Sequence, residues 1–245
     1  MSAFRETAKV GSAHPTLADA VTNELRELIV DGVLSAGTRL VEHNLADQLA
    51  VSRVPLREAI KQLEGEGLVR RIPRRGTVVA TLTATDVDEL FDVRESLEAL
   101  AAGLAALRAD RADLAILAGY LDQAQLLSQR GEANEIARLN VTFHAGIIKM
   151  ARSTLLESLM SPLQSRMRWL FRILTASNQD QVLMCQEHSE IYEGIASGDR
   201  QRAEKLAREH IARTREPTLR VLRAQTGLAD TNLDSFSLPT PDVAR

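Results

Sequence analysis

Residues 40–80 read LVEHNLADQLAVSRVPLREAIKQLEGEGLVRRIPRRGTVVA, and this stretch decides the fold of the first third of the chain. Leu45 and Leu49 mark the apolar side of a short helix that ends near residue 50. Ser52 is a favourable N-cap for a second helix, and Pro55 is tolerated in its first turn because the backbone N–H groups there have no helical acceptor. The stretch therefore predicts two short helices joined by a tight turn.

The second of these helices has a buried stripe and is followed by a β-hairpin. The apolar positions of the stripe are Leu56, Ala59, Ile60 and Leu63. Gly67 ends the helix. Two β-branched runs, at residues 68–72 and 77–80, then flank the sequence Pro73-Arg74-Arg75-Gly76, which predicts a hairpin with a basic tip.

Two elements upstream complete a domain. The spacing of apolar residues predicts a helix over residues 17–31 and a short β-like segment over residues 38–41. A helix, a short strand, two helices joined by a tight turn and a hairpin make a winged helix-turn-helix over residues 16–80.

Everything after a short linker at residues 81–85 is expected to be helical. Thr85 is expected to cap a long helix that runs to about residue 109. The further helical segments are expected at residues 111–129, 132–151, 154–176, 180–197 and 199–224, with Pro162 and Pro217 bending or breaking their helices. Because no βαβ alternation is present, the predicted fold class is mainly α, with an all-helical bundle of six or seven helices over residues 86–224. Residues 1–15 and 225–245 are expected to be disordered.

The composition is typical of a protein of the cytoplasm. The chain has 245 residues, 44% hydrophobic and 26% charged, with a net charge of −3, which fits one or two domains with cores of their own. Cys185 is the only cysteine, which excludes intrachain disulfides and cysteine-rich zinc modules. No apolar run approaches the length of a membrane span, and the first 15 residues lack the apolar segment of a secretory signal. We therefore expect a cytoplasmic protein without a membrane span.

Basic residues concentrate in the predicted turn and hairpin, although the whole chain is slightly acidic. Seven Lys or Arg residues lie between Arg53 and Arg75, against three glutamates. Such a cluster is often only a solvated face, but here it coincides with a DNA-binding fold. Arg53, Val54 and Arg57 stand at the start of the recognition helix, where an arginine can pair with guanine O6 and N7. Operator DNA is therefore the expected partner, with Arg75 at the hairpin tip contacting phosphate.

The same stretch resembles the N-terminal domain of the GntR family of bacterial transcription regulators. The run SRVPLREAIKQLEGEGLV followed by PRRGTVV is more specific than a bare helix-turn-helix pattern. The resemblance implies DNA contacts at His43, Arg53, Val54, Pro55, Arg57 and Gly76. The glycine lets the wing backbone approach the DNA closely. Since one winged helix reads only a few base pairs, a homodimer on a palindromic operator is expected.

Three histidines are spread over three helices of the predicted bundle. They are His144, His188 and His210, and Asn140 precedes His144 by four residues, so that these two share a helix face. Three imidazoles and an amide oxygen suit a divalent ion such as Zn²⁺, Ni²⁺ or Mn²⁺, with positions left for water or an effector. The alternative is a set of hydrogen-bonded, partly buried histidines that hold no ion.

The bundle sequence also resembles a known module. VRESLEALAAGLAA, LNVTFHAGI and EHSEIYEGIASGDRQRAEKLAREH are similar to successive parts of the FadR C-terminal domain, the effector-binding module of one GntR subfamily. The resemblance implies a metal held by Asn140, His144, His188 and His210, with asparagine in place of the commoner aspartate. Arg94 matches an arginine that commonly faces the effector, which favours a small carboxylate ligand. The alternative for Arg94 is a surface or interhelical salt bridge with Glu95 or Glu98.

No catalytic signature accompanies the predicted metal site. The sequence has no HExxH motif, nucleophile elbow, P-loop or dinucleotide fingerprint. Glu187 and Glu209 each neighbour a predicted ligand but point about 100° away from it on a helix, which places them poorly as general bases. We therefore expect a regulator rather than an enzyme, with a small organic acid controlling operator affinity through the linker at residues 81–85. The alternative is a regulator for which the metal ion itself is the signal.

Overall fold

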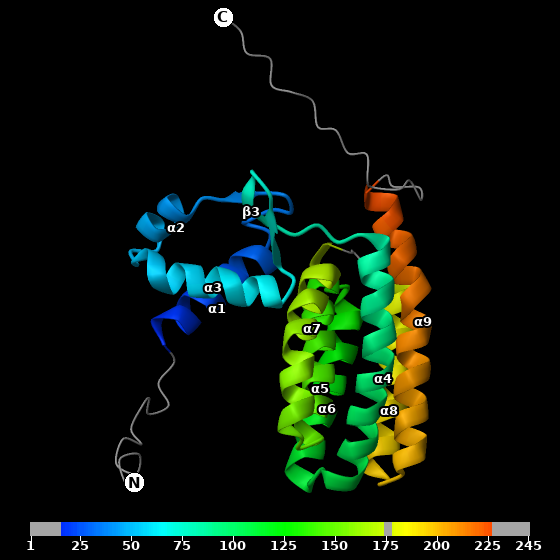
Figure 1. Ribbon diagram of the computed structural model, residues 1–245. Helices are drawn as coiled ribbons and strands as arrows, with labels where there is room; N and C mark the ends of the chain where they lie inside the picture. Colours follow the sequence, from blue (N-terminus) through cyan, green and yellow to red (C-terminus); the bar gives the residue numbers. More distant parts are fainter. Residues whose placement is uncertain (1–15, 174–177, 227–245) are drawn as a thin grey trace, which may run out of the picture.

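The computed structural model describes residues 16–173 and 178–226, which form two domains (Figure 1). A small amino-terminal domain of three helices and a three-stranded sheet lies beside one end of a long helical bundle. The predicted fold class is therefore confirmed. Within the described residues, no helix is long and apolar enough to cross a membrane. The sequence predicts residues 1–15 and 225–245 to be disordered. Residues 225 and 226 belong instead to the end of the last helix, and the others lie outside the described part of the chain.

The amino-terminal domain is the predicted winged helix-turn-helix. Its elements are α1 (Leu17–Val30), β1 (Arg39–Leu40), α2 (Glu42–Gln48), α3 (Arg53–Gly65), β2 (Val69–Ile72) and β3 (Gly76–Val79). β1 and β2 pair antiparallel with the two sides of β3, so the β-like segment upstream adds a third strand to the predicted hairpin. Ser52 stands at the N-cap of α3, as predicted, but its side chain makes no capping hydrogen bond.

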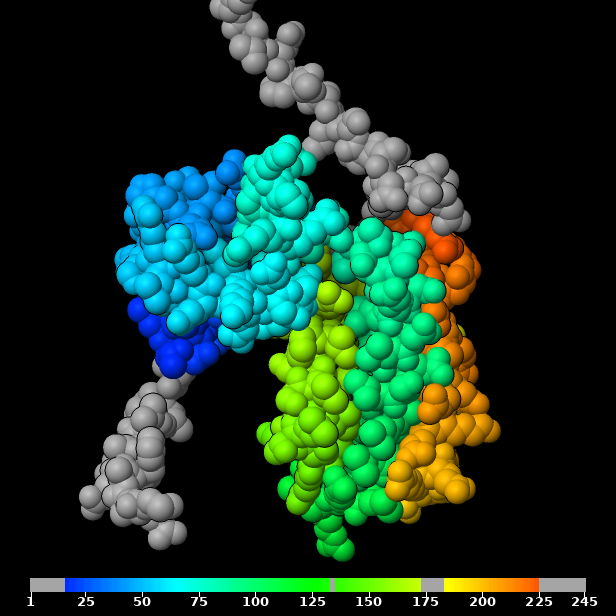
Figure 2. Space-filling model, viewed as in Figure 1, coloured from blue at the N-terminus to red at the C-terminus, as the bar shows by residue number. Residues whose placement is uncertain are grey.

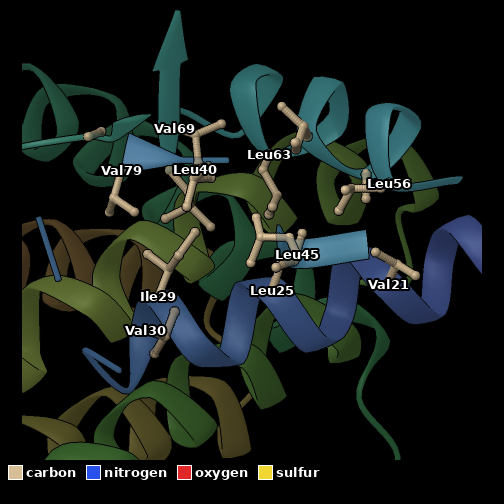
Figure 3. Close-up of a cluster of buried hydrophobic side chains, with 14 of the residues drawn as sticks. Val21, Leu25, Ile29, Val30, Leu40, Leu45, Leu56, Leu63, Val69 and Val79 are labelled. Carbon is tan, nitrogen blue, oxygen red and sulfur yellow. The ribbon is translucent and has the colours of Figure 1, made fainter. Parts of the chain in front are cut away.

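One apolar cluster holds this domain together (Figure 3). Leu25 of α1 faces Leu56 and Leu63 of α3, and all three side chains are fully buried. Val79 of β3 closes the cluster on the sheet side. Trp169 belongs to the same cluster, although it comes from the helical bundle. The bundle thus contributes a large aromatic side chain to the core of the small domain.

Six helices form the bundle within the described residues. They are α4 (Ala84–Arg108), α5 (Arg111–Arg130), α6 (Ala133–Met150), α7 (Thr154–Ile173), α8 (Asn178–Ala196) and α9 (Arg200–Thr226). α4 packs along α9 and also contacts α6, α7 and α8, so it is the central helix. Gly103 permits the close approach of α9, because a Cβ at this position would overlap the carboxylate of Glu204.

The start of α4 differs from the prediction. Thr83, not Thr85, is the N-cap: Asp86 N–H donates to Thr83 Oγ1 (3.1 Å) and Thr83 N–H donates to Asp86 Oδ2 (2.9 Å). The reason is a hydrophobic staple, since this register buries Val87 next to Leu82 just before the cap. The extended connection between β3 and α4 therefore ends at residue 83, two residues earlier than expected.

The two prolines predicted to bend or break helices lie inside continuous ones. Pro162 is within α7 and Pro217 is within α9. A proline removes one backbone hydrogen bond from a helix but leaves the side-chain contacts on both sides of it intact. Buried neighbours, Met160 before the first proline and Leu219 after the second, hold each helix against the bundle. The expectation of a break at these positions was wrong.

Candidate functional site

The start of α3 presents its side chains to solvent. Arg53 and Val54 are exposed, with Val54 retaining 67% of its accessible surface. Arg57 follows one turn later and forms an ion pair with Glu42 of α2, with Nε 2.7 Å from Oε2. An exposed valine between two arginines suits a surface that meets base edges, where thymine methyl groups alternate with acceptor atoms. Pro55 is partly buried behind this face.

The wing stands beside this helix and completes a groove of about 790 Å³. The basic residues of its lining are Arg39, Arg57, Lys61 and Arg71, and the acidic ones are Glu42 and Glu64. Gly76 also lines the groove and has a φ of +84°, a left-handed conformation that favours glycine. The sequence prediction missed Arg39, whose position on the first strand becomes relevant only once that strand pairs with β3.

The remaining predicted DNA contacts lie outside this lining. His43 is at the start of α2, where its Nε2 lies 3.4 Å from Asp47 Oδ2 and its side chain is largely exposed. Arg75 is exposed in the turn between β2 and β3. His43, Arg53 and Arg75 are thus exposed on three different elements of the domain, α2, the start of α3 and the turn of the wing. The C-terminal end of α3 points toward α7 instead (Figure 1).

A second site lies inside the bundle, where three helices bring three imidazoles together. His144 of α6, His188 of α8 and His210 of α9 are all buried, and their ligand nitrogens lie within 4.8 Å of one another. The Nε2 atoms of His188 and His210 are 3.2 Å apart. Phe143 stacks on the His188 ring at a centroid distance of 4.3 Å. The structure therefore brings together the three histidines that the sequence singles out.

Two carboxylates orient these imidazoles from behind. Glu98 Oε2 lies 2.6 Å from His144 Nδ1, and Glu187 Oε2 lies 2.6 Å from His210 Nδ1. A carboxylate only accepts, so each Nδ1 carries the proton and each Nε2 presents its lone pair toward the cluster. This arrangement of carboxylate behind histidine is common at metal centres.

The sequence prediction assigned neither carboxylate to this role. Glu187 points away from its neighbour His188, as its helical position requires, and this brings it to the histidine of the next helix. Glu98 lies four residues after Arg94 on the same face of α4. The signal for its role would have been that this face of the helix is buried.

Unsatisfied polar atoms mark the remaining side of the cluster. Asn140 Oδ1 and His144 Nε2 are buried and have no hydrogen-bond partner. Both residues line a cavity of about 20 Å³ together with Arg94, Met160 and other side chains of α4, α6 and α7. Buried polar atoms normally have partners, so these two are positioned for something that binds between them. An amide oxygen and three imidazole nitrogens are a chemically suitable donor set for a divalent ion.

Arg94 is buried beside the cavity rather than on the surface. Its Nε donates to Glu98 Oε1 at 2.7 Å, and its guanidinium carbon lies 5.1 Å from the centre of the Phe91 ring. Glu98 is one of the two salt-bridge partners considered from the sequence. The ion pair is buried and lies within one helix, whereas a surface or interhelical pair was considered. Arg94 Nη1 has no hydrogen-bond partner. One edge of the guanidinium is thus engaged, and its other edge has a buried donor without an acceptor.

Burial and charge set the protonation of the cluster. Burial raises the pKa of Glu98, but the charge of Arg94 and the hydrogen bonds from Arg94 and His144 outweigh it and hold the pKa well below its ordinary value. Burial lowers the pKa of His188 well below its ordinary value, and the neighbouring imidazoles lower it further. Burial also lowers the pKa of His210, although the hydrogen bond that His210 donates to Glu187 raises it. At neutral pH, Glu98 is therefore ionised, and His188 and His210 are neutral imidazoles, the form that binds metals.

Two family models match the chain, one for each domain. Residues 17–79 match the bacterial regulatory proteins of the gntR family, and residues 89–213 match the FCD domain. The chain is 32% identical over 191 residues to YdhC of Bacillus subtilis (strain 168), an uncharacterized HTH-type transcriptional regulator, covering 77% of this chain and 84% of that protein. It is 34% identical over 129 residues to the gluconate operon transcriptional repressor of the same organism, covering 53% of each protein.

Solved structures share the same fold. Escherichia coli McbR/YncC has a TM-score of 0.71 at 23% identity and matches 84% of this chain and 98% of that one. A transcriptional regulator GntR from Rhodococcus sp. RHA1 has a TM-score of 0.68 at 27% identity, over 82% and 97% of the two chains. From a winged helix-turn-helix and an FCD domain in this order, and from a relative 32% identical over most of both chains, we conclude that this protein belongs to the GntR family of bacterial transcription regulators.

Proposed function

We propose that this regulator is a homodimeric repressor whose affinity for its operator is set by a small organic acid bound at a metal ion in the bundle. The observation that carries the proposal is the pair of unpartnered buried atoms, Arg94 Nη1 and Asn140 Oδ1, at one cavity beside the histidine cluster. A donor and an acceptor left without partners in the same cavity suit a ligand with both metal-binding and anionic groups. The gluconate operon repressor, a relative named above, supports a repressor.

Operator binding is proposed for the face that carries α3 and the wing. Arg53 and Val54 are exposed at the helix start, where residues of a recognition helix reach base edges. Arg75 projects from the wing, where a basic side chain meets phosphate. We therefore assign Arg53 to the recognition of base sequence and Arg75 to DNA affinity that does not depend on sequence.

We expect Arg53→Ala to weaken binding to the preferred operator by about 1–3 kcal/mol, since it removes a base contact. Arg75→Ala should weaken binding evenly across sequences and reduce the salt dependence by about one phosphate contact. An operator selected from random DNA by the wild-type protein, followed by anisotropy titrations at several salt concentrations, measures both. Arg202→Ala, an exposed arginine of α9, is the control. Unchanged affinity and salt dependence in both wing-domain variants would remove this face from DNA binding.

Metal binding is proposed for the Nε2 atoms of His144, His188 and His210 with Asn140 Oδ1. Carboxylates hold the Nδ1 atoms of His144 and His210, and the ligand nitrogens of all three imidazoles lie within 4.8 Å of one another. A bound ion would supply positive charge and open coordination positions for a carboxylate. Zn²⁺, Ni²⁺ and Mn²⁺ all accept such a nitrogen and oxygen donor set. Around the ion, the chain's own residues hold the imidazoles in the required tautomer and exclude bulk water.

We expect about one divalent ion per chain in the purified protein, and chelation should lower its melting temperature because the ion binds only the folded form. His188→Ala should abolish the bound metal, and Glu187→Gln should weaken metal affinity about 10–100-fold by releasing His210. Elemental analysis and zinc titration measure these changes. His43→Ala, in the DNA-binding domain, should keep the full metal content. If His188→Ala retains as much metal as the wild type, His188 is not a ligand.

The effector is proposed to be a small carboxylate held between the metal and Arg94. A guanidinium with one free edge is suited to a carboxylate oxygen. The competing proposal, in which the ion itself is the signal, needs no role for this free edge. If the ion is the signal, metal alone changes operator affinity. If the carboxylate is the signal, the change requires the acid as well.

We expect a thermal-shift screen of sugar acids, hydroxy acids and dicarboxylates to identify an acid that stabilises the zinc-loaded protein. Arg94→Lys keeps the charge but loses the planar fork, so it should bind that acid at least about tenfold more weakly while retaining the metal. Operator titrations with Zn²⁺ alone and with Zn²⁺ plus the acid then separate the two signals. Equal acid affinity in wild type and Arg94→Lys would rule out the carboxylate contact, and a full response to Zn²⁺ alone would favour the metal as the signal.

Dimer formation is proposed for the outer face of α4. Val93, Leu100 and Leu107 are exposed at seven-residue intervals, and Leu97 and Leu104 lie half-buried between them. These five residues follow one another at alternating spacings of four and three. This is the spacing of apolar residues along the seam of contact between two paired helices. Figure 2 shows α4 accessible along the bundle between α7 and α9.

We expect Leu100→Glu to convert the dimer to a monomer, because it places a charge at the centre of the seam. Operator affinity should fall with it, since two half-sites are then bound independently. Light scattering after size exclusion gives the mass. Ile116→Glu makes the same change at a more exposed apolar residue of α5, and this variant should keep the mass of a dimer. A dimeric Leu100→Glu protein would place the interface elsewhere.

A further inference from the structure

The helix α7 contacts both domains, with different sides. Toward the bundle it contributes five residues to the lining of the cavity beside the histidine cluster. They are Met160, Leu163, Gln164, Met167 and Phe171. Toward the DNA-binding domain it contributes an arginine, a tryptophan and another arginine at positions 166, 169 and 172, three residues apart and so on one side of a helix.

The two arginines cap helices of the DNA-binding domain. Arg166 Nε donates to the carbonyl oxygen of Glu66 at 2.9 Å, at the C-cap of α3. Arg172 Nη1 donates to the carbonyl oxygen of Val30 at 3.2 Å, in the last residue of α1. The last carbonyls of a helix lack helical donors and carry partial negative charge, so a guanidinium is a favourable partner. One helix of the bundle thus anchors the ends of two helices of the DNA-binding domain, including the recognition helix α3.

Glycines at these helix ends make room for the arginines. Gly67 and Gly32 have φ values of +71° and +69°, and a Cβ on either would overlap the guanidinium that caps its helix. Gly37 in the same domain has a φ of +80° but open space around it. The first two glycines are therefore required both for backbone conformation and for docking, whereas Gly37 is required for conformation alone.

Trp169 and an ion pair complete the docking. Trp169 is 3% exposed and belongs to the apolar core of the DNA-binding domain. Arg168 pairs with Glu27 of α1, with Nη1 2.9 Å from Oε1. The hydrogen bond from Arg168 lowers the pKa of Glu27, so the pair is charged at neutral pH. The position of α7 thus determines where the DNA-binding domain sits.

We propose that α7 is the element that transmits occupancy of the bundle cavity to the recognition helix; the identity of the occupant rests on the proposed function, but the mechanical connection does not. The cavity of about 20 Å³ has room for roughly one water, so any larger ligand displaces its walls. Met160 and Met167 are the most adaptable of these walls, and both are on α7. Pro162 lies between them in the sequence and removes one backbone hydrogen bond from α7, which lowers the resistance of the helix to bending there.

This route differs from the one expected from the sequence. The linker was expected to couple the domains, and its Leu82 packs against the apolar clusters of both, but none of its described residues caps a helix end of the DNA-binding domain. α7 instead reaches the carboxyl ends of both α1 and α3 and the core between them. A displacement of α7 therefore moves or releases the whole DNA-binding domain relative to the bundle.

Trp169 is the only tryptophan of the chain, so its fluorescence reports docking directly. Leu163→Phe adds bulk to the cavity wall and pushes α7 outward without any ligand. We expect acrylamide quenching of Trp169 to rise at least about twofold, and the Kd for the selected operator to change at least about fivefold, the lower end of ordinary allosteric coupling. Ile195→Phe adds the same bulk to the bundle core from α8 and is the matched control, expected to change neither.

A second pair of variants tests the contact between α7 and the DNA-binding domain by changing glycines of that domain. Gly67→Ala displaces Arg166, whereas Gly37→Ala imposes the same backbone strain in open space. We expect increased Trp169 quenching only in Gly67→Ala, with zinc affinity unchanged in both. If Leu163→Phe misfolds, as circular dichroism would show, this pair decides by itself.

The outcomes separate the two proposals. Wild-type quenching and operator affinity in folded Leu163→Phe, or equal quenching in Gly67→Ala and Gly37→Ala, overturn the role of α7. If neither Zn²⁺ nor any screened acid changes operator affinity in the wild type while Leu163→Phe does, coupling through α7 holds and the proposed signal is wrong.

Discussion

The charge of Glu98 in the interior of the bundle is the constraint on which the internal site depends. A carboxylate buried without partners costs several kcal/mol, so this group has to be stabilised from more than one side. Arg94 does this from the same helix and His144 from α6, with contacts of 2.7 and 2.6 Å. Those contacts use one edge of the guanidinium and one nitrogen of the imidazole. Arg94 Nη1 on the other edge and His144 Nε2, the other ring nitrogen, are buried without a hydrogen-bond partner, as is Asn140 Oδ1 at the same cavity.

The same arrangement is repeated on the opposite side of the cluster. Glu187 on α8 holds the imidazole of His210 on α9 and also lies 3.0 Å from Arg213 Nε. Each carboxylate is therefore shared between one histidine and one arginine. This sharing holds the protons of His144 and His210 on Nδ1, which leaves their Nε2 atoms free to bind. The two carboxylates behind the cluster thus explain the orientation of His144 and His210.

The DNA-binding domain depends on the bundle in a different way. A domain of this size buries only a modest fraction of its surface, and stability from its own core is limited. Trp169 adds a large buried aromatic side chain to that core, and two arginines of α7 satisfy helix ends that would otherwise face solvent. Docking therefore stabilises the small domain and orients it at the same time. A regulator that uses one interface for both has little freedom to move its recognition helix without involving α7.

Local pattern in the sequence determined much of this protein. The turn before Ser52, the apolar stripe of α3 and the basic hairpin predict a winged helix-turn-helix, because caps, periodicity and turn residues act over a few neighbouring positions. The spacing of Asn140 and His144 likewise places two donors on one helix face, since helix geometry alone requires it. Resemblance to GntR regulators then joined these signals to a function and a ligand set.

Only the tertiary structure decided what depends on distant packing. The cap of α4 moved to Thr83 because Leu82 and Val87 are buried together, and both prolines were accommodated because buried neighbours outweigh one lost hydrogen bond. Glu98 and Glu187 acquired their roles from histidines on other helices, at separations in sequence that no local rule covers. The position of Trp169 in the core of another domain is of the same kind. Periodicity predicts which side of a helix is buried, but the partner that buries it is chosen by the packing of the whole chain.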